Sequence, residues 1–388
     1  MRIAVAYDCL FPFTTGGGER QYRQFAESMA AAGHEVDYLT TRQWEGDAPS
    51  APFTVVAITP ALSLYDDAGV RRPAVAAQFA AALGTYLARH RRSYDAVLVS
   101  ALPVLNVFAT RAALAGTRVV QVFDYLEVWP REQWIAYSGR AVGLVAWALQ
   151  RGAVALTPTA TCHSELSARR LRAEGLRRPP LVSPGLISGR DRVDVVPEAA
   201  TPPYLVYVGR HIQDKRVDTL PAALAWARRE LPGLRAVILG EGPERAAVEA
   251  AVEAAGVADA VDLPGFVSEE ALRDAIGGAA VLVNPSRREG YGLVVVEAAA
   301  FGTPVVLADD PGNASVELVT EDVNGFVAPS TDPAELGAAI LRAVRGGPAL
   351  RARTRAWYDD ALVSRSIERT AATILAHIQD AVDSQRQR

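Results

Sequence analysis

Residues 204–239 read YLVYVGRHIQDKRVDTLPAALAWARRELPGLRAVIL, and this stretch decides the fold class. Two short apolar runs, at 204–208 and 236–239, flank a longer alanine- and arginine-rich segment at 219–230. Short apolar runs suit fully buried parallel strands, and the longer segment between them suits a crossover helix. The stretch therefore predicts a strand–helix–strand unit with a polar loop after its first strand.

The same alternation continues along all 388 residues. Strands are predicted at 3–7, 35–40, 96–100, 119–123 and 154–157, and in the second half at 204–208, 236–239, 261–263, 280–284 and 303–307. Helices are predicted at 19–32, 72–90, 104–115 and 140–152, and later at 219–230, 244–255, 269–276, 292–300 and 333–345. This order indicates an α/β chain with two doubly wound, Rossmann-like domains, which bind ligands at the carboxyl ends of their strands and face each other across a cleft.

The predicted domains are 1–198, 199–365 and a final helix at 366–388 that packs back toward the first domain. A net charge of −4 gives no overall attraction to nucleic acid. The cysteines, Cys9 and Cys162, do not form a disulfide framework, and the five histidines lack metal-ligand spacing. No signal peptide and no membrane-length apolar run occur, so we expect a cytoplasmic protein without a metal. The sequence does not indicate an oligomeric state.

One lysine stands among the forty basic residues, and it lies in the loop after the strand at 204–208. This residue, Lys215, follows Gly209 and Arg210 closely. Lysine offers a compact charge and arginine a planar fork, so Arg210 and Lys215 together suit a diphosphate. The alternative for Lys215 is an ordinary solvated loop position.

A second loop carries two carboxylates, Glu289 and Glu297, around a predicted strand-to-helix turn. Gly290 and Gly292 allow the backbone to approach a ligand closely, and the start of the following helix favours a diphosphate. Glu289 is then placed for sugar hydroxyls and Glu297 for the paired hydroxyls of a ribose. The alternative is a solvated turn in which Glu297 pairs with Arg288.

These two loops, with residues 240–243 (GEGP), 264–267 (PGFV) and 323–326 (VNGF), resemble the retaining GT-B glycosyltransferases of family 4, also called group 1. The resemblance implies transfer of a sugar from a nucleoside-diphosphate sugar, with UDP more usual than GDP, to a hydroxyl of a small polar acceptor. Such an acceptor would be a sugar, a cyclitol or a natural-product scaffold. It further implies retention of the anomeric configuration, a donor held mainly by the second domain, and no cofactor or required metal.

The resemblance also implies roles for individual residues. Arg210 and Lys215 would neutralise the leaving diphosphate, with Glu289 beside them as a third catalytic residue. The donor-binding set would be Gly16, Gly17, Gly18, Gly209, Glu241, Phe266, Val267, Gly290, Tyr291, Gly292, Leu293 and Glu297. Two alternatives stay open here: Phe266 as a core residue, and Glu19 as a residue that complements the dipole of the helix it opens.

The chain departs from the family after the strand at 119–123, where many relatives carry a His-Asp pair. Phe123 stands at the histidine position and Asp124 remains. We expect Asp124 to contribute to catalysis and acceptor binding, or else to cap the following turn. The predicted acceptor set is Asp124, Tyr125, Glu127, Trp129 and Arg131, with core packing as the alternative for the aromatic residues.

Two other functions are weighed. A peripheral membrane glycosyltransferase with a lipid-linked acceptor would use basic runs such as 90–92 and 169–172, but the sequence shows no amphipathic stripe rich in exposed aromatics. A non-catalytic nucleotide-sugar-binding subunit would have no need for Arg210 and Lys215. The triple glycine at 16–18 lacks the G-x-G-x-x-G spacing of nicotinamide-binding folds.

Overall fold

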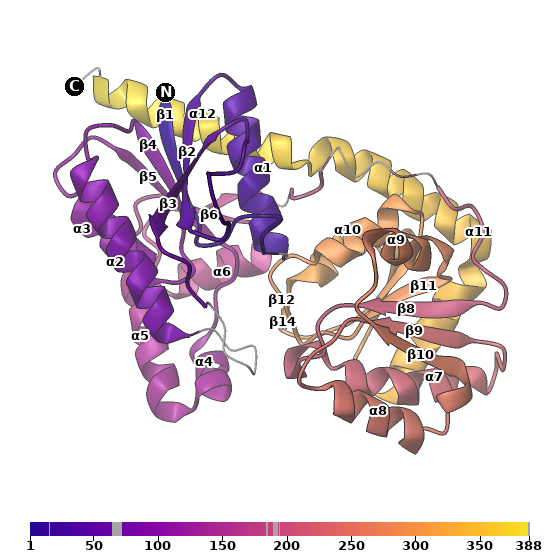
Figure 1. The fold of residues 1–388 in the computed structure, drawn as a ribbon. Helices are drawn as coiled ribbons and strands as arrows, with labels where there is room; N and C mark the ends of the chain where they lie inside the picture. The colour runs from indigo at the N-terminus through magenta and orange to yellow at the C-terminus, as the bar shows by residue number, and fades with distance from the viewer. Residues whose placement is uncertain (15, 64–71, 184, 189–192, 194, 387–388) are drawn as a thin grey trace. The chain divides into compact units, whose positions relative to one another are not determined.

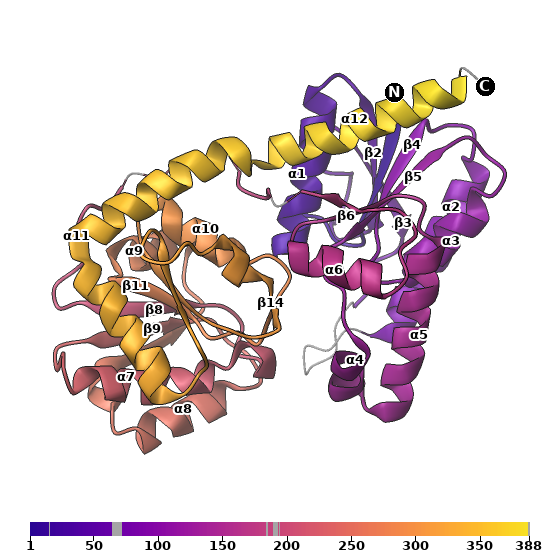
Figure 2. The same cartoon turned by 180° about the vertical axis from the view of Figure 1, so that it is seen from behind.

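The computed structural model describes residues 1–14, 16–63, 72–183, 185–188, 193 and 195–386, and it confirms the predicted α/β class (Figures 1 and 2). The chain divides into two compact units. One comprises Met1–Leu186 together with Arg365–Arg388, and the other comprises Ile187–Ser364. Each unit contains its own parallel sheet flanked by helices.

The first unit contains a seven-stranded sheet in the order β3-β2-β1-β4-β5-β6-β7, with all neighbouring strands parallel. Its strands are β1 (Arg2–Ala6), β2 (Glu35–Thr41), β3 (Thr54–Thr59), β4 (Ala96–Ser100), β5 (Val120–Tyr125), β6 (Ala160–Cys162) and β7 (Leu181–Val182). Its helices are α1 (Gly17–Ala31), α2 (Pro73–Arg89), α3 (Leu105–Ala113), α4 (Arg131–Ser138), α5 (Arg140–Leu156), α6 (Glu165–Ala173) and α12 (Ile367–Arg386). The C-terminal helix α12 packs against α1 of the same unit (Figure 1).

The second unit contains a six-stranded parallel sheet in the order β10-β9-β8-β11-β13-β15. Its strands are β8 (Tyr204–Val208), β9 (Arg235–Leu239), β10 (Val261–Gly265), β11 (Val281–Asn284), β13 (Val305–Ala308) and β15 (Gly325–Ala328), and β12 (Arg288–Glu289) pairs separately with β14 (Gly312–Asn313). Its helices are α7 (Leu220–Arg228), α8 (Arg245–Ala254), α9 (Glu269–Gly278), α10 (Leu293–Ala300) and α11 (Pro333–Ser364). The strand order reverses between β8 and β11, so the loops after these two strands flank the position where doubly wound sheets bind ligands.

The strand predicted at 154–157 is wrong, because these residues end helix α5. Val154 is buried while Leu156 is exposed, so the apolar run belongs to a helix that is covered on one side only. A short apolar run does not by itself distinguish these two structures. The next strand is β6, which begins at Ala160.

The division between the units falls after Leu186, and not after residue 198 as the sequence suggested. The intervening segment is hydrogen-bonded to the second unit: the Val196 amide donates to the Phe301 carbonyl, and Ala200 donates to Gly278 at 2.9 Å. The buried Arg351 guanidinium reinforces this attachment by donating to the Val196 carbonyl at 2.9 Å. These bonds tie the segment to helices α9, α10 and α11 of the second unit before the first strand of that unit begins.

Candidate active site

The loop after β8 carries Arg210 and Lys215, and backbone bonds fasten it to the loop after β9. The His211 amide donates to the Glu241 carbonyl, and the Glu244 amide donates to the His211 carbonyl, both at 2.9 Å. The approach is so close that a Cβ on Gly242 would lie 2.3 Å from the His211 oxygen. A glycine is therefore required in the GEGP motif at this position.

Lys215 and Glu289, two of the predicted catalytic residues, form an ion pair although 74 positions separate them. The Lys215 Nζ lies 2.5 Å from Glu289 Oε1, and Asn284 Nδ2 donates to the same oxygen at 3.0 Å. Burial alone would raise the pKa of Glu289, but the charge of Lys215 and hydrogen bonds from Lys215, Asn284 and Ser286 outweigh it and lower that pKa. Glu289 is therefore held as a carboxylate beside a fixed cation.

Arg210 differs from Lys215 in having an exposed side chain. Within the described ranges, its guanidinium makes no hydrogen bond and no ion pair. An unpaired guanidinium beside the Lys215 loop is free to take a phosphate in the two-pronged way that arginine favours. The two cations thus lie on one loop. Lys215 is held by the Glu289 carboxylate, whereas the Arg210 side chain is exposed to solvent.

The Lys215 loop is also clamped to the segment that precedes α10. Asp214 accepts from Arg287 Nη2 at 2.7 Å and lies 2.9 Å from Arg288 Nη2. Gly292 caps α10 with a φ of 100°, and a Cβ there would lie 2.4 Å from the Ser315 Cβ. The positive φ and the close contact with Ser315 both require glycine at position 292. The backbone N–H groups at the start of α10 are therefore not screened by a side chain here and can bind a ligand directly.

The remaining predicted donor residues of α10 lie around this turn. Gly290, Leu293 and Glu297 are partly buried, and Tyr291 is buried. Arg288, which the alternative interpretation pairs with Glu297, forms an ion pair with Asp214.

Glu241 lies against the PGFV segment at 264–267. The Gly240 amide donates to the Gly265 carbonyl at 2.9 Å, and a Cβ on Gly265 would lie 2.4 Å from Glu241 Oε1. Phe266 is 77% exposed, and Val267 is exposed beside it. Phe266 is therefore not a core residue, and an exposed aromatic ring next to this loop is available to a flat ligand.

In the first unit, Asp124 at the end of β5 is fully buried and fully hydrogen-bonded. Its Oδ1 accepts from Thr161 Oγ1 at 2.6 Å and from His163 Nε2 at 2.8 Å. Its Oδ2 accepts from Tyr22 Oη at 2.9 Å and from Gln21 Nε2 at 3.1 Å. This placement corrects the expected direct contact between Asp124 and an acceptor hydroxyl, because neither oxygen faces solvent.

His163 is the partner that sequence reasoning missed. Burial alone would raise the pKa of Asp124 and lower that of His163, but their mutual attraction and hydrogen bonds reverse both effects, so the pKa of Asp124 is lowered and that of His163 is raised. His163 Nδ1 also lies 3.0 Å from the Ser183 carbonyl, so both ring nitrogens meet oxygen acceptors. The two directions both favour the charged forms of the pair, and Gln21 Nε2 lies 2.8 Å from His163 Nε2 in the same network.

The origin of His163 shows which signal could have found it. Strand β6 pairs with β5 in a register that sets Asp124 opposite Thr161, and His163 follows directly after β6. The neighbouring strand end thus supplies a histidine to Asp124, while Phe123 is buried in the core. Burial raises the pKa of the adjacent Cys162 thiol to about 12, which does not suit a nucleophile.

The Asp124–His163 pair predicts a pH dependence of stability. The pKa of His163 is higher in the folded state than in the unfolded state. Its contribution to the free energy of unfolding is therefore complete below about pH 6.5, and it is lost as the pH rises from there through the pKa of the folded state. The pKa of Asp124 is lowered in the folded state, so the stability that Asp124 contributes is lost as the pH falls through that lowered pKa. We expect the free energy of unfolding, measured by urea titration across neutral pH, to decrease toward alkaline pH in the wild type. The variant His163→Gln should lack this decrease, and an equal slope in both proteins would contradict the pairing.

The glycine loop at 16–18 opens α1, with Gly16 as the N-cap. A Cβ on Gly18 would lie 2.5 Å from the Tyr7 hydroxyl, and one on Gly16 would lie 2.3 Å from Glu19 Oε2. The Glu19 carboxylate thus lies over the start of α1, where it complements the helix dipole. Gly17 is the first residue of the helix.

The predicted acceptor residues divide between core and surface. Tyr125 is buried and its hydroxyl lies 2.8 Å from Thr157 Oγ1, which corrects its expected acceptor contact. Glu127 Oε2 accepts from Trp129 Nε1 at 2.7 Å, and the Trp129 ring lies 4.6 Å from that of Trp134. Arg131 is exposed at the start of α4. The partly exposed loop at 127–131 therefore remains a candidate surface for a polar acceptor.

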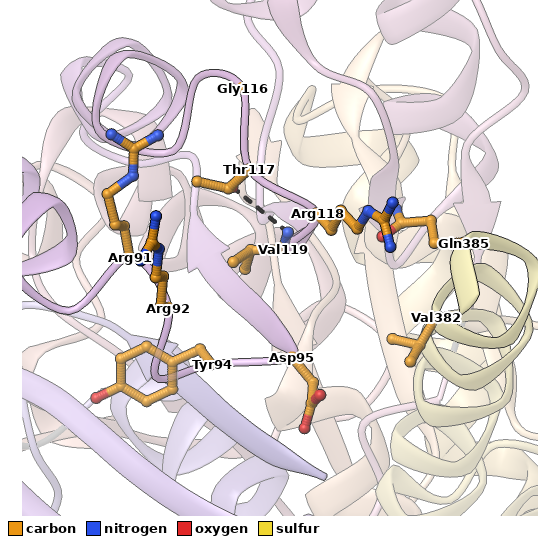
Figure 3. A pocket seen from close by; sticks show the side chains of 10 residues that line it. All are labelled: Arg91, Arg92, Tyr94, Asp95, Gly116, Thr117, Arg118, Val119, Val382 and Gln385. Atoms are coloured by element: carbon orange, nitrogen blue, oxygen red, sulfur yellow. Dashed lines mark hydrogen bonds between the residues drawn. The ribbon is translucent and has the colours of Figure 1, made fainter. Parts of the chain in front are cut away.

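A hollow of about 540 Å³ lies at the opposite edge of the first sheet (Figure 3). Arg91, Arg92 and Arg118 line it beside the amino ends of β4 and β5, with Val382 and Gln385 of α12 on the other side. Figure 3 shows the guanidinium of Arg118 directed toward Gln385 and away from Arg91 and Arg92. The three cations do not converge, and the hollow is separate from the strand ends that carry Asp124.

No group of three or more histidine, cysteine or carboxylate side chains able to hold a metal ion occurs in the described part of the chain. Across the same ranges, no helix combines the length and apolar content needed to cross a bilayer.

Two doubly wound parallel sheets, each in its own unit, define the GT-B fold, and solved structures of that fold match nearly the whole chain. Sucrose-phosphate synthase from Thermosynechococcus elongatus superposes with a TM-score of 0.79 at 19% identity, covering 99% of both chains. HepE from Anabaena, solved with UDP and glucose, gives a TM-score of 0.70 at 16% identity, covering 98% of this chain and 99% of HepE.

The chain belongs to the group 1 glycosyltransferases of family 4. Residues 16–185 match the glycosyl transferase 4-like domain, and residues 191–356 match the glycosyl transferases group 1 family. The curated relatives include alpha-D-kanosaminyltransferase of Streptomyces kanamyceticus, 32% identical over 39% of this chain and 38% of the relative. They also include D-inositol 3-phosphate glycosyltransferase of Segniliparus rotundus, 32% identical over 46% of this chain and 41% of the relative. This chain therefore aligns with well under two thirds of these proteins.

Proposed function

We propose that the protein transfers a sugar from a nucleoside-diphosphate sugar to a hydroxyl of a small polar acceptor, with retention of the anomeric configuration. The observation that carries this proposal is the Lys215–Glu289 pair beside the open guanidinium of Arg210. Fixed cations at a leaving phosphate stabilise the charge that develops in the transition state. A binding subunit without catalysis would have no use for such a fixed pair.

The proposed reaction combines that charge arrangement with the retaining mechanism that the family resemblance implies. The bond between the anomeric carbon and the phosphate oxygen breaks, and the acceptor oxygen forms its bond to the anomeric carbon on the same face. The acceptor proton passes to the departing phosphate oxygen, so the leaving group itself serves as the base. Arg210 and Lys215 neutralise the negative charge of the diphosphate. Glu289 holds Lys215 in place and faces the sugar.

The donor proposal combines three segments of the second unit. The start of α10 at Gly292 would receive the diphosphate, Glu297 the ribose hydroxyls, and the loop of Glu241 with Phe266 the base. UDP is the proposed nucleotide, supported by the fold shared with HepE, which was solved with UDP. No cofactor and no metal are included, and the two cations of the 209–215 loop are assigned the neutralising role.

The acceptor proposal draws on the relatives. One of them, D-inositol 3-phosphate glycosyltransferase, is named for a phosphorylated cyclitol, which is polar and hydroxyl-rich. We assign acceptor contact to Glu127, Trp129 and Arg131, and we assign Asp124 to positioning this loop through its buried network. The cytoplasmic location also stays a prediction, and it accords with Cys9 and Cys162 as free, buried thiols.

The donor assignment is tested by calorimetric titration of the full chain with UDP, GDP, ADP and TDP. We expect one nucleotide, UDP, to bind and to raise the melting temperature, because a ligand specific to the folded state stabilises it. The anomeric configuration of the product, read by nuclear magnetic resonance, tests retention. Binding of no nucleotide would refute the donor site, and an inverted product would refute the mechanism.

The variant Glu297→Ala tests the ribose contact. We expect about tenfold weaker UDP binding, since a carboxylate that accepts from two hydroxyls contributes about this much. Glu270→Ala is the matched control, because Glu270 is an exposed carboxylate of α9. Equal UDP affinity in both variants and the wild type would remove Glu297 from the donor site.

A further inference from the structure

Arg216, the residue after Lys215, has a backbone conformation that favours glycine. Its φ of 49° and ψ of 38° lie in the left-handed region, which a residue with a side chain rarely adopts. Among the described residues other than glycine, only Arg216 and Asp322 have a positive φ. Aspartate tolerates this region better than arginine does, so the conformation of Arg216 requires a specific stabilising contact.

The backbone of Arg216 joins two short turns. Its amide donates to the Gln213 carbonyl at 3.3 Å and ends the 3-10 turn at Gln213–Lys215. Its carbonyl accepts from the Thr219 amide at 3.1 Å and from Thr219 Oγ1 at 2.7 Å, and these bonds hold the next turn. The left-handed residue therefore sets the direction in which the turn that carries Lys215 leaves the rest of the loop.

The side chain of Arg216 supplies the stabilising contact by reaching a carboxylate on another loop. Its Nη2 donates to Asp310 Oδ2 at 2.6 Å, and the two side chains are only 26% and 17% exposed. The other oxygen, Asp310 Oδ1, accepts from the Gly312 amide at 2.9 Å, where β14 begins. One carboxylate thus holds the arginine and shapes the loop after β13.

Three consecutive side chains of the Lys215 loop pair with opposite charges on two neighbouring loops. The pairs are Asp214 with Arg287 and Arg288, Lys215 with Glu289, and Arg216 with Asp310. The two neighbouring loops are joined to each other, because β12 pairs with β14 and Asn313 Nδ2 donates to the Ser286 carbonyl at 3.2 Å. Arg216 is therefore anchored to the same framework that holds Glu289.

We propose that Arg216 and Asp310 are positioning residues for glycosyl transfer: their ion pair stabilises the left-handed turn that holds Lys215 against Glu289. Arg216 acts through the backbone, because it adjoins Lys215 and Asp310 neutralises its own charge. Its paired guanidinium is less available to a phosphate than the exposed guanidinium of Arg210. The effect on turnover rests on the proposed function, whereas the effect on the Lys215 side chain does not.

Two replacements of Arg216 separate backbone conformation from charge. Arg216→Gly removes the ion pair but adopts the left-handed turn without strain, whereas Arg216→Ala removes the pair and keeps the strain. We expect Arg216→Ala to lower turnover by about tenfold or more, because a displaced catalytic group loses its geometry, and Arg216→Gly to lower it by a smaller factor. UDP affinity should change less than turnover, since the charge on the leaving phosphate is greatest in the transition state. An equal loss of turnover in both variants would assign the effect to charge and overturn the positioning role.

The chain also offers a readout that does not depend on activity, because Lys215 is its only lysine. Lysine labelled at Cε gives one side-chain signal in nuclear magnetic resonance, and the relaxation of that signal reports the mobility of Lys215. We expect a rigid side chain in the wild type, a mobile one in Arg216→Ala and an intermediate one in Arg216→Gly. Unchanged mobility in Arg216→Ala would overturn the proposal even if turnover fell.

The variant Asp310→Asn tests the other half of the ion pair. Asparagine keeps an oxygen that can accept from the Gly312 amide but removes the charge that holds Arg216, so the variant should also release Lys215. Added to Arg216→Gly, the same replacement should have little further effect, because its partner is already absent. Fully additive effects of the two replacements on Lys215 mobility would show that the residues act independently and would contradict the proposal.

The matched control is Arg353→Ala. Arg353 is an exposed arginine of the same unit that pairs with Asp322, the other residue with a positive φ. Its replacement should leave both turnover and the lysine signal unchanged, and circular dichroism should show that every variant is folded. A lysine signal that follows the expected order in a protein without glycosyl transfer would refute the proposed function and still support the hold of Arg216 on Lys215.

Discussion

Replacing Lys215 with alanine is expected to lower the turnover of glycosyl transfer by about a hundredfold or more, the usual effect of removing one fixed charge partner of a leaving oxyanion. The loss has two parts. The cation that faces the diphosphate disappears, and Glu289 loses the neighbour that lowers its pKa. A partly buried carboxylate without its cation would also repel the departing phosphate.

Two controls separate charge from general damage. Lys215→Arg keeps the charge but replaces a compact group with a broad planar one, so we expect partial recovery of turnover. Arg273→Ala removes an exposed cation of α9 from the same unit and should leave turnover unchanged. Initial rates with saturating donor, together with UDP affinities, provide the measurement. Near-normal turnover in Lys215→Ala would refute the leaving-group role.

The pairing of Lys215 with Glu289 could be anticipated because of the order of strands in a doubly wound sheet. Both residues follow strands that are neighbours, β8 and β11, and the carboxyl ends of parallel strands meet at one edge. Motif order along the sequence was therefore enough to place two loops side by side. The exposure of Phe266 could not be anticipated in this way, because an apolar residue at a strand end suits a core and a ligand surface equally.

The network around Asp124 could not be predicted for a different reason. The register of β5 and β6 brings Thr161 and His163 beside Asp124, and Tyr22 reaches it from helix α1. The predicted strand at 154–157 displaced β6 by several residues, so His163 was not placed beside Asp124. Every residue of β5 is buried, so the sequence of this strand shows no alternation of buried and exposed positions. The register of its pairing with β6 therefore cannot be deduced from that pattern.

Replacing Asp124 with alanine is expected to lower the free energy of unfolding of the first unit by about 3–5 kcal/mol, because it leaves His163 as an unpaired buried charge. Three other donors, from Gln21, Tyr22 and Thr161, lose their acceptor at the same time. Urea titration followed by far-ultraviolet circular dichroism measures the change. Asp47→Ala, which removes an exposed carboxylate of the same unit, should change the unfolding free energy little.

The double variant Asp124→Ala, His163→Leu distinguishes lost charge pairing from lost volume. If the buried charge of His163 causes most of the destabilisation, removing it as well should restore part of the stability, since a leucine fills the space without a charge to bury. If the cavity at Asp124 causes it, the double variant should be no more stable than Asp124→Ala. Recovery in the double variant, together with loss of the alkaline decrease in stability, would establish His163 as the cation that Asp124 holds. The histidine missing at position 123 would then have a structural counterpart on the neighbouring strand, one that supports the acceptor loop from inside the unit.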